Sequence, residues 1–243
     1  MSRIELLHHA LTKKPQTVLD LGVGDGSHTK AFIATGSSVV GVDVKDPPHK
    51  HERYTHSQMP VEFLEPADDA EPYDMVWCSH LLQLLPNVQA FLVQIDSFLK
   101  DDGWLYIAVP SNTQERFHIG QLTLWTPALL VYNLICAGWD CSKAEWFTSY
   151  DTIGLCVQKK RIEDMSWRTG TIEELPSLND HSPVAMKHEH GAWWSNNWPV
   201  DLPGRAMDPP MVTAGVIKTN LQPHTQLAYG PNPELRKEPG TWD

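Results

Sequence analysis

The sequence has no long uninterrupted run of apolar residues. None of its hydrophobic stretches approaches the roughly 20 residues that a membrane-spanning helix needs, although 41% of the 243 residues are hydrophobic. The N-terminal segment MSRIELLHHALTKK is too short and too polar for a secretory signal peptide. We therefore expect no membrane span, and we expect a location in the cytoplasm.

Cysteine is scarce, and its spacing excludes the common cysteine frameworks. The four cysteines are Cys78, Cys136, Cys141 and Cys156. No two of them form a CxxC pair, so we expect buried, reduced thiols. The histidine pairs His49/His51 and His188/His190 have HxH spacing, and His181 lies near the second pair. Two such pairs without a third fixed ligand are weak evidence for a site, and we expect no metal.

Basic residues are too few for an extended nucleic-acid surface. The chain has 19 lysines and arginines against 30 aspartates and glutamates, a formal net charge of -11. The densest basic cluster, residues 159–161, is short and is followed by acids. Because phosphate backbones are negatively charged, nucleic acid is a disfavoured partner.

Short apolar segments alternate with helical patterns between residues 15 and 160. Strands are expected at residues 17–21, 38–42, 53–57, 73–79, 104–109, 144–147 and 154–159. Helices are expected at residues 4–11, 29–34, 81–99 with a break at Pro86, and 127–137, and Asp102-Gly103 is read as a turn. Strands that are apolar on both faces and alternate with helices predict an α/β fold. We expect a Rossmann-like, doubly wound, mostly parallel seven-stranded sheet with helices on both faces.

The composition changes after residue 160. Residues 161–243 contain ten of the 19 prolines and five of the ten tryptophans, with little periodicity. We therefore divide the chain into a domain at residues 1–160 and a loop-rich C-terminal extension at residues 161–243 that is not an independent domain. Trp193, Trp194 and Trp198 either fix this extension onto the domain or form an aromatic platform for a sugar ring.

The stretch VLDLGVGDGSH, residues 18–28, places three glycines at alternate positions after a strand. They are Gly22, Gly24 and Gly26, and glycine lets the backbone approach a ligand closely. The dinucleotide fingerprint is GxGxxG, but Ser27 stands at its sixth position here. Asp20 and Asp25 would repel a pyrophosphate, whereas they would attract an ammonium and a sulfonium. This charge pattern favours S-adenosylmethionine over NAD.

A further acid, Asp43, ends the second strand SSVVGVD, residues 37–43. A carboxylate has two acceptor oxygens and can bind both hydroxyls of a ribose, and this acid stands about twenty residues beyond the turn, as in nucleotide-binding folds. We assign ribose binding to Asp43. We expect Asp20 either near the amino group of the cofactor, directly or through water, or as an acid that caps the next turn.

These motifs resemble those of class I S-adenosylmethionine-dependent methyltransferases. VLDLGVGDG at residues 18–26 matches the first motif of that family, and VGVD at residues 40–43 matches its ribose-binding acid. YDMVWCSHLLQLLP at residues 73–86 resembles its fourth-strand motif, and residues 91–110 resemble the next helix and strand. Residues 121–140, QLTLWTPALLVYNLICAGWD, are similar to small-molecule and glycan methyltransferases. The resemblance covers roughly residues 15–160.

The resemblance implies an S-adenosyl-L-methionine-dependent methyltransferase that methylates oxygen on a small molecule or a glycan. Further cofactor contacts are expected from Val44, Glu62, Phe63, Cys78 and Ser79. Glu62 is the candidate for the adenine amine and Phe63 for packing on the ring, while Cys78 and Ser79 should line the floor of the site.

A hydroxyl acceptor must lose its proton, and two histidines are candidates for the catalytic base. His80 directly follows the fourth strand, and His118 lies in the loop RFHIG, residues 116–120. A lone histidine is often structural, so neither assignment is fixed by the sequence.

The chain departs from the family pattern at three points. Gln83-Leu84 stands where the family often has Glu-His, and Gln121 stands where it often has histidine. The proline-rich segment PPHKH, residues 47–51, replaces the helix between the second and third strands. The alternative is therefore a non-catalytic cofactor-binding or structural protein with a degenerate methyltransferase fold. In that case the extension would bind a partner or form a homo-oligomer.

Overall fold

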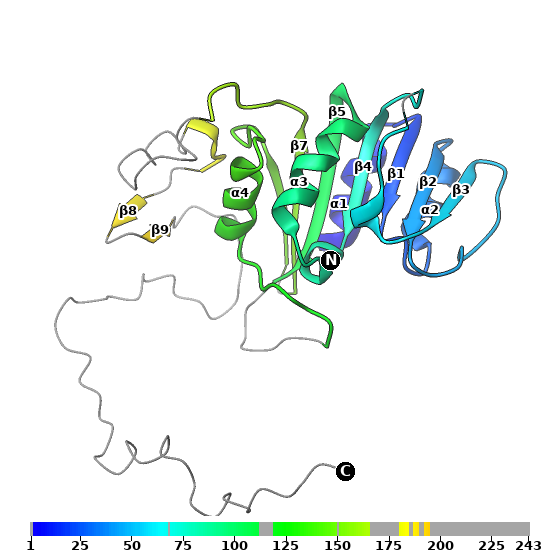
Figure 1. Cartoon of the computed structure of the whole chain (residues 1–243), viewed down its shortest axis with the longest axis horizontal. Coiled ribbons are helices and arrows are strands. Elements are labelled where there is room, and N and C mark those ends of the chain that lie inside the picture. The colour runs from blue at the N-terminus through cyan, green and yellow to red at the C-terminus, as the bar shows by residue number, and fades with distance from the viewer. Residues whose placement is uncertain are drawn as a thin grey trace, which may run out of the picture. The chain divides into compact units, whose positions relative to one another are not determined.

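The computed structural model describes residues 2–67, 69–111, 119–149, 151–165, 180–184, 187–189 and 192–194. All of them belong to one compact unit, Met1–Arg205. Its main strands are β1 (Thr17–Leu21), β2 (Ser38–Asp43), β3 (Tyr54–Gln58), β4 (Tyr73–Ser79), β5 (Leu99–Pro110), β6 (Glu145–Thr148) and β7 (Thr152–Gln158). They form one seven-stranded sheet with the order β3-β2-β1-β4-β5-β7-β6 (Figure 1).

The first five strands of this sheet are parallel. β1 pairs with β2 and β4, β2 pairs with β3, and β4 pairs with β5, all in parallel register. β7 is antiparallel to both β5 and β6. The expected mostly parallel, Rossmann-like sheet is confirmed. Its strand order reverses between β1 and β4, and open sheets of this type bind ligands at the carboxyl ends of the strands at such a point.

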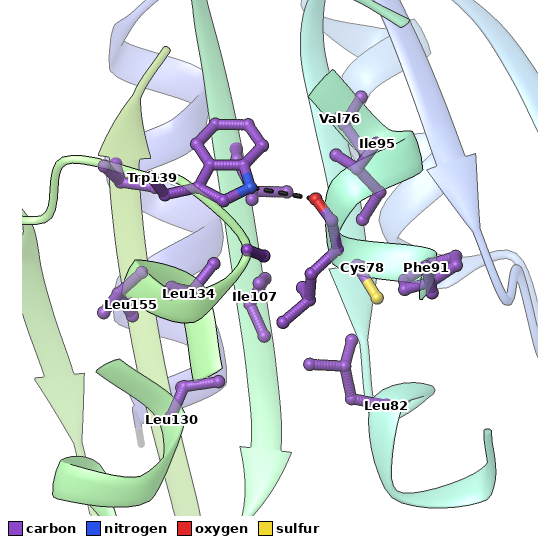
Figure 2. Close-up of a cluster of buried hydrophobic side chains, with 14 of the residues drawn as sticks. Val76, Cys78, Leu82, Phe91, Ile95, Ile107, Leu130, Leu134, Trp139 and Leu155 are labelled. Atoms are coloured by element: carbon purple, nitrogen blue, oxygen red, sulfur yellow. Dashed lines mark hydrogen bonds between the residues drawn. The ribbon is translucent and has the colours of Figure 1, made fainter. Parts of the chain in front are cut away.

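Helices cover both faces of the sheet (Figure 1). α1 (Ser2–Thr12) and α2 (Ser27–Ala34) pack on one face, where Leu6 and Phe32 meet Trp77 and Tyr106. α3 (Val88–Ile95) and α4 (Pro127–Cys136) pack on the other face over the larger apolar cluster. Figure 2 shows this cluster, in which the Trp139 indole N–H donates to the Leu92 carbonyl at 2.9 Å. The buried indole therefore keeps its polar group satisfied inside an apolar core.

The helical segment expected at residues 81–99 is broken near Pro86, as expected. It consists of the short 3₁₀ helix η2 (Leu82–Leu84), then α3, then the 3₁₀ helix η3 (Asp96–Phe98). The Asn87 side chain caps α3 by accepting from the Ala90 N–H at 3.1 Å. Proline ends the first piece, and the asparagine cap starts the next.

The turn expected at Asp102-Gly103 is wrong, because β5 runs through both residues. The register between β4 and β5 jumps there, from the pair Tyr73–Leu99 to the pair Met75–Trp104. The two residues therefore mark an irregularity within a strand. The dipeptide Asp-Gly occurs in β-bulges as well as in turns, and in a bulge one extra residue of a strand stays unpaired with the neighbouring strand.

In the described part of the connection from β3 to β4, residues 59–67 and 69–72, the helical element is the 3₁₀ helix η1 (Val61–Phe63) and no α-helix forms. A cavity of about 160 Å³ lies where residues 64–73 pass over the sheet, with Leu19, Val40 and Phe98 among its walls. None of the residues expected to bind the cofactor lines this cavity. Among the described residues, no helix combines the length and the apolar character required to cross a bilayer.

Part of the C-terminal segment is described as a two-stranded antiparallel sheet. It consists of β8 (Lys187–Glu189) and β9 (Ala192–Trp194), in which His188 pairs with Trp193. Trp198 and His190 lie outside the described residues. The division of the chain at residue 160 stays a prediction.

Candidate cofactor and acceptor site

The glycine turn joins β1 to α2, and its backbone requires glycine. Gly22, Gly24 and Gly26 have φ values of 78°, 58° and 72°, in the left-handed region. A Cβ atom on Gly26 would lie 2.5 Å from Pro48 Cγ and 2.9 Å from His49 Nδ1. The proline-rich segment therefore lies directly against one side of the turn, so a larger residue would collide with it.

Asp43 ties the end of β2 to this turn. The Gly24 N–H donates to Asp43 Oδ2 at 2.9 Å, and the Lys45 N–H donates to Asp43 Oδ1 at 3.0 Å. Each carboxylate oxygen has two lone pairs and retains acceptor capacity after these bonds. The two segments predicted to share one ligand are thus in direct contact.

Asp20 lies beneath the turn, on the side of α2. Its side chain is only 2% exposed, and its carboxylate accepts from Thr29 Oγ1 at 2.6 Å. Burial raises the pKa of Asp20 to about 7, the Thr29 bond opposes this change, and the charge of Asp43 adds to it. The Thr29 hydroxyl of α2 thus holds this carboxylate in place, and both expected roles of Asp20 stay predictions.

A polar cluster that the sequence did not reveal supports the turn from β3. The Tyr54 ring lies across β2 at Gly41, where a Cβ atom would be 2.7 Å from Tyr54 Oη. The His49 ring stacks on Tyr54 with centroids 4.8 Å apart, and Tyr54 Oη is hydrogen-bonded to His56 Nδ1 at 2.7 Å. The glycine in VVGVD was the only signal, because a glycine inside a strand often marks a close approach.

Exposed apolar side chains lie beside the Asp43 end of the site. Val44 is 61% exposed and Phe63 is 70% exposed. The Met59 N–H donates to the Asp43 carbonyl at 3.0 Å and so holds the chain leading into η1 against the end of β2. Glu62 is partly exposed in η1. Val44 thus offers apolar surface directly after the residue expected to bind ribose, and η1 begins two residues after the bonded Met59.

Cys78 does not line the site through its side chain, contrary to expectation. It has no exposed surface and belongs to the apolar cluster drawn in Figure 2. Burial, followed by the charge of Asp20, raises the pKa of its thiol above the ordinary value. Successive side chains of a strand point to opposite faces, and that of Cys78 points into the core. Ser79, the last residue of β4, is partly exposed.

His80 follows β4 in a strained backbone conformation. Its φ is 57°, which is uncommon for a residue with a Cβ atom. Its N–H donates to the Ala108 carbonyl at 2.7 Å, and its own carbonyl accepts from Gln83 Nε2 at 2.6 Å. The next residue, Leu81, contacts the turn, since a Cβ atom on Gly22 would lie 3.3 Å from it. Strain of this kind costs about 1–3 kcal/mol and is concentrated at functional sites.

Gln83 connects the end of β4 to the segment before α4. It is 5% exposed, and besides the bond to His80 its carbonyl accepts from the Leu122 N–H at 2.7 Å. Sequence reasoning noted Gln83 only as a departure from the family pattern. The available signal was a single amide inside the apolar run LLQLLP, because buried amides are normally bonded.

His118 lies outside the described residues, as do residues 112–117. Of the two HxH pairs, only His49 and His51 have described side chains. His49 lies at the glycine turn, whereas His188 is described only as part of the β8 backbone. The expectation of no metal at these pairs stays a prediction.

Residues 3–155 match the family model of the methyltransferase domain. The chain belongs to this family. The match begins in α1 and ends in β7, so it contains the glycine turn, Asp43, His80 and Gln83. The resemblance to class I S-adenosylmethionine-dependent methyltransferases is confirmed, and so is the fold that it implied.

Two curated relatives are ubiquinone biosynthesis O-methyltransferases. That of Glaesserella parasuis is 27% identical over 112 residues, covering 41% of this chain and 48% of the relative. That of Hydrogenovibrio crunogenus is 24% identical over 144 residues, covering 56% of this chain and 58% of the relative. The matched region thus spans about half the length of these relatives.

Solved structures agree in fold. The 1,6-didemethyltoxoflavin-N1-methyltransferase of Burkholderia thailandensis, solved with S-adenosylhomocysteine, has a TM-score of 0.55 and 22% identity, covering 65% of this chain and 78% of that one. The N-methyltransferase NodS of Bradyrhizobium japonicum, also solved with S-adenosylhomocysteine, has a TM-score of 0.54 and 12% identity, covering 65% and 85%. At these identities the likeness is one of fold.

The residues present fit S-adenosylmethionine, the cofactor of this family. Asp25 and Asp43 place carboxylates at the turn, which suits a ligand carrying an ammonium and a sulfonium, and Asp20 lies buried beneath it. The Ser27 N–H bonds to Asp25 and holds the pKa of that carboxyl below its ordinary value. The exposed side chains of Val44 and Phe63 provide apolar surface for an adenine ring.

Proposed function

We propose that this chain is an S-adenosylmethionine-dependent methyltransferase that methylates oxygen on a small molecule or a glycan. The observation that carries the proposal is the left-handed glycine turn bonded to the carboxylate of Asp43. The names of the curated relatives support oxygen as the acceptor atom. The two N-methyltransferases resemble this chain in fold only, so they do not support nitrogen as the acceptor atom.

In this proposal the ends of β2 and η1 bind the nucleoside part of the cofactor. Asp43 accepts hydrogen bonds from the ribose hydroxyls, Val44 and Phe63 flank the adenine, and Glu62 accepts from its amine. Gly22 and Gly24 keep the turn free of side chains where the amino acid part binds. When bound, the cofactor supplies an electrophilic methyl group on its sulfonium.

The acceptor would bind beside His80, at the carboxyl ends of β4 and β5. Alignment of the two reactants is the main contribution that a protein makes to such a displacement. The imidazole of His80 would take the hydroxyl proton, and Gln83 would hold the backbone of His80 in the required conformation. His118 remains the second candidate for the base.

Calorimetric titration with S-adenosylmethionine tests the cofactor site. We expect Asp43→Asn to weaken binding about tenfold or more, because hydrogen bonds to charged groups contribute about 1.5–3 kcal/mol. Asp46→Asn is the matched control, since Asp46 is an exposed acid three residues later. An unchanged melting temperature would show that the loss is not due to unfolding. Equal affinities for both variants would overturn the assignment of Asp43.

Turnover separates an enzyme from a non-catalytic relative. S-adenosylhomocysteine release should be assayed with panels of phenols, sugars and amines as acceptors. His80→Asn is the informative variant, because asparagine tolerates the left-handed backbone and lacks a base. We expect kcat to fall about 10²–10⁴-fold with an unchanged Kd for the cofactor. Cofactor binding without release for any acceptor class would favour the non-catalytic alternative.

We also propose a cytoplasmic location and a homo-oligomer formed through residues 161–243. All four cysteines lie within the described residues and none forms a disulfide, which is what a reducing compartment would produce. Light scattering on the full chain and on a chain ending at residue 165 tests the oligomer. A full chain that is monomeric at high concentration would contradict it.

A further inference from the structure

A row of three polar side chains crosses strands β5, β7 and β6 on the face covered by α1. In the antiparallel register Tyr106 is paired with Cys156, and Cys156 is paired with Glu145. Directly paired residues place their side chains on the same face, with Cβ atoms about 4.5–5.5 Å apart. The backbone register itself therefore brings a phenol, a thiol and a carboxylate together.

Helix α1 places His9 over this row. His9 Nδ1 lies 3.1 Å from Tyr106 Oη and 3.6 Å from Cys156 Sγ, and His9 Nε2 lies 3.7 Å from Glu145 Oε2. The Phe147 ring packs against the imidazole with centroids 5.0 Å apart, which fixes its position. The ligand atoms of His9, Glu145 and Cys156 all lie within 4.8 Å of one another.

We propose that His9, Cys156 and Glu145 form a binding site for zinc or a similar borderline divalent metal ion. Thiolate, imidazole and carboxylate are the ligands that zinc uses, at bond lengths that put tetrahedral ligand atoms roughly 3.3–3.7 Å apart. The imidazole binds through one nitrogen only. In the structure Cys156 lies at Nδ1 of the ring and Glu145 at Nε2. The Glu145 side chain, half exposed at the edge of the sheet, therefore has to rotate toward a metal held at Nδ1. Water takes the fourth position.

The site is separate from the glycine turn. Asp20 pairs with Trp77, Trp77 with Tyr106, and Tyr106 with Cys156, so three strand spacings separate Asp20 from Cys156. At about 4.8 Å per spacing this is roughly 14 Å. The metal would therefore join the N-terminal helix to strands about 140 residues later in the chain, a structural role that does not depend on the proposed methyl transfer.

Metal binding changes the protonation of this site. Burial, followed by the charge of Glu145, raises the pKa of Cys156 to about 12, and burial lowers the pKa of His9. Without metal the thiol is protonated and the imidazole neutral. On binding, the S–H bond breaks, its proton leaves to solvent, and a sulfur–metal bond forms.

Titration of the untagged full chain with Co²⁺ tests the proposal, because thiolate ligation gives a charge-transfer band in the near ultraviolet. We expect one equivalent of Co²⁺ to produce this band in the native chain, and Zn²⁺ to abolish it by displacement. Cys156→Ser should lose the band. Cys141→Ser is the matched control, since Cys141 is also fully buried but belongs to the larger apolar cluster on the other face of the sheet, and it should keep the band.

A second variant keeps the test decisive if Cys156→Ser fails to fold. Glu145→Gln alters a half-exposed side chain. This variant should retain the band, but its affinity for Co²⁺ should be lower by about tenfold or more. Zn²⁺ should raise the melting temperature of the native chain more than that of this variant. The band requires a thiolate ligand, so Co²⁺ bound only by histidines elsewhere in the chain would not produce it. Absence of the band from the native chain would therefore overturn the proposal. Persistence of the band in a folded Cys156→Ser variant would also overturn it.

Discussion

Asp20 lies one residue before the end of β1 and Asp43 ends the neighbouring β2, yet their carboxylates have different surroundings. Asp20 pairs with Gly41, two residues before Asp43, so the two acids lie at different depths along the sheet. Asp20 is buried against Thr29, whereas Asp43 is partly exposed at the turn. The sequence identified both acids. Their different depths follow from the register of β1 and β2, which a single sequence does not specify.

The raised pKa of Asp20 predicts a pH-dependent stability. An acid whose pKa is raised in the folded state binds more protons there, so its contribution is complete below about pH 4 and is lost as the pH rises to about 7. An asparagine side chain does not titrate in this range. We therefore expect Asp20→Asn to gain stability relative to the native chain over this range, by at most roughly 4 kcal/mol. Urea unfolding at several pH values measures the difference.

Asp74 provides a control of opposite sign. Burial opposes its ionisation, but hydrogen bonds from Lys100 and from the backbone of Gln16 and Thr17 outweigh burial and lower its pKa. Its contribution is present above the unfolded pKa and is lost as the pH falls. Asp74→Asn should therefore be less stable than the native chain at neutral pH, and this difference in unfolding free energy should disappear at acid pH. If the difference in unfolding free energy from the native chain changed with pH in the same direction for both variants, the environments described for the two acids would be contradicted.

At the scale of elements, the glycine turn shows what a motif predicts and what it leaves open. The three alternating glycines indicated a turn after the first strand, and all three have left-handed φ values, which residues with a Cβ atom adopt only rarely. The contact of Gly26 with Pro48 and His49 was not predictable, because it depends on how the link after β2 folds back. The proline-rich segment stands in place of a helix between β2 and β3, as expected, and it also forms one wall of the turn.

Two alanine substitutions separate these effects. A Cβ atom on Gly24 would meet only the Gly22 carbonyl oxygen, at 4.0 Å, whereas one on Gly26 would overlap Pro48 and His49. We expect Gly24→Ala to cost about 1–2 kcal/mol of unfolding free energy from its left-handed backbone alone. Gly26→Ala should cost at least about 1 kcal/mol more, because packed atoms must move. Equal costs in denaturant unfolding would contradict the contact with residues 48 and 49.

For the whole molecule, the acidic surface limits the partners. A formal net charge of -11 leaves little attraction for a polyanion. We expect no shift of single-stranded or double-stranded nucleic acid by the full chain at physiological salt in a gel assay. Binding that weakens steeply with salt would contradict this, because it would reveal a basic surface that neutralises phosphates.

The sequence by itself determined the alternation of elements, the glycine turn and the acid after the second strand. These depend on local periodicity and on the conformational freedom of glycine, which short segments carry. Tertiary structure decided that Cys78 points into the core and that Gln83 holds His80. It also decided that His9 lies over Cys156, 147 residues away. Such contacts depend on strand order and register, which long-range packing selects and no local pattern encodes.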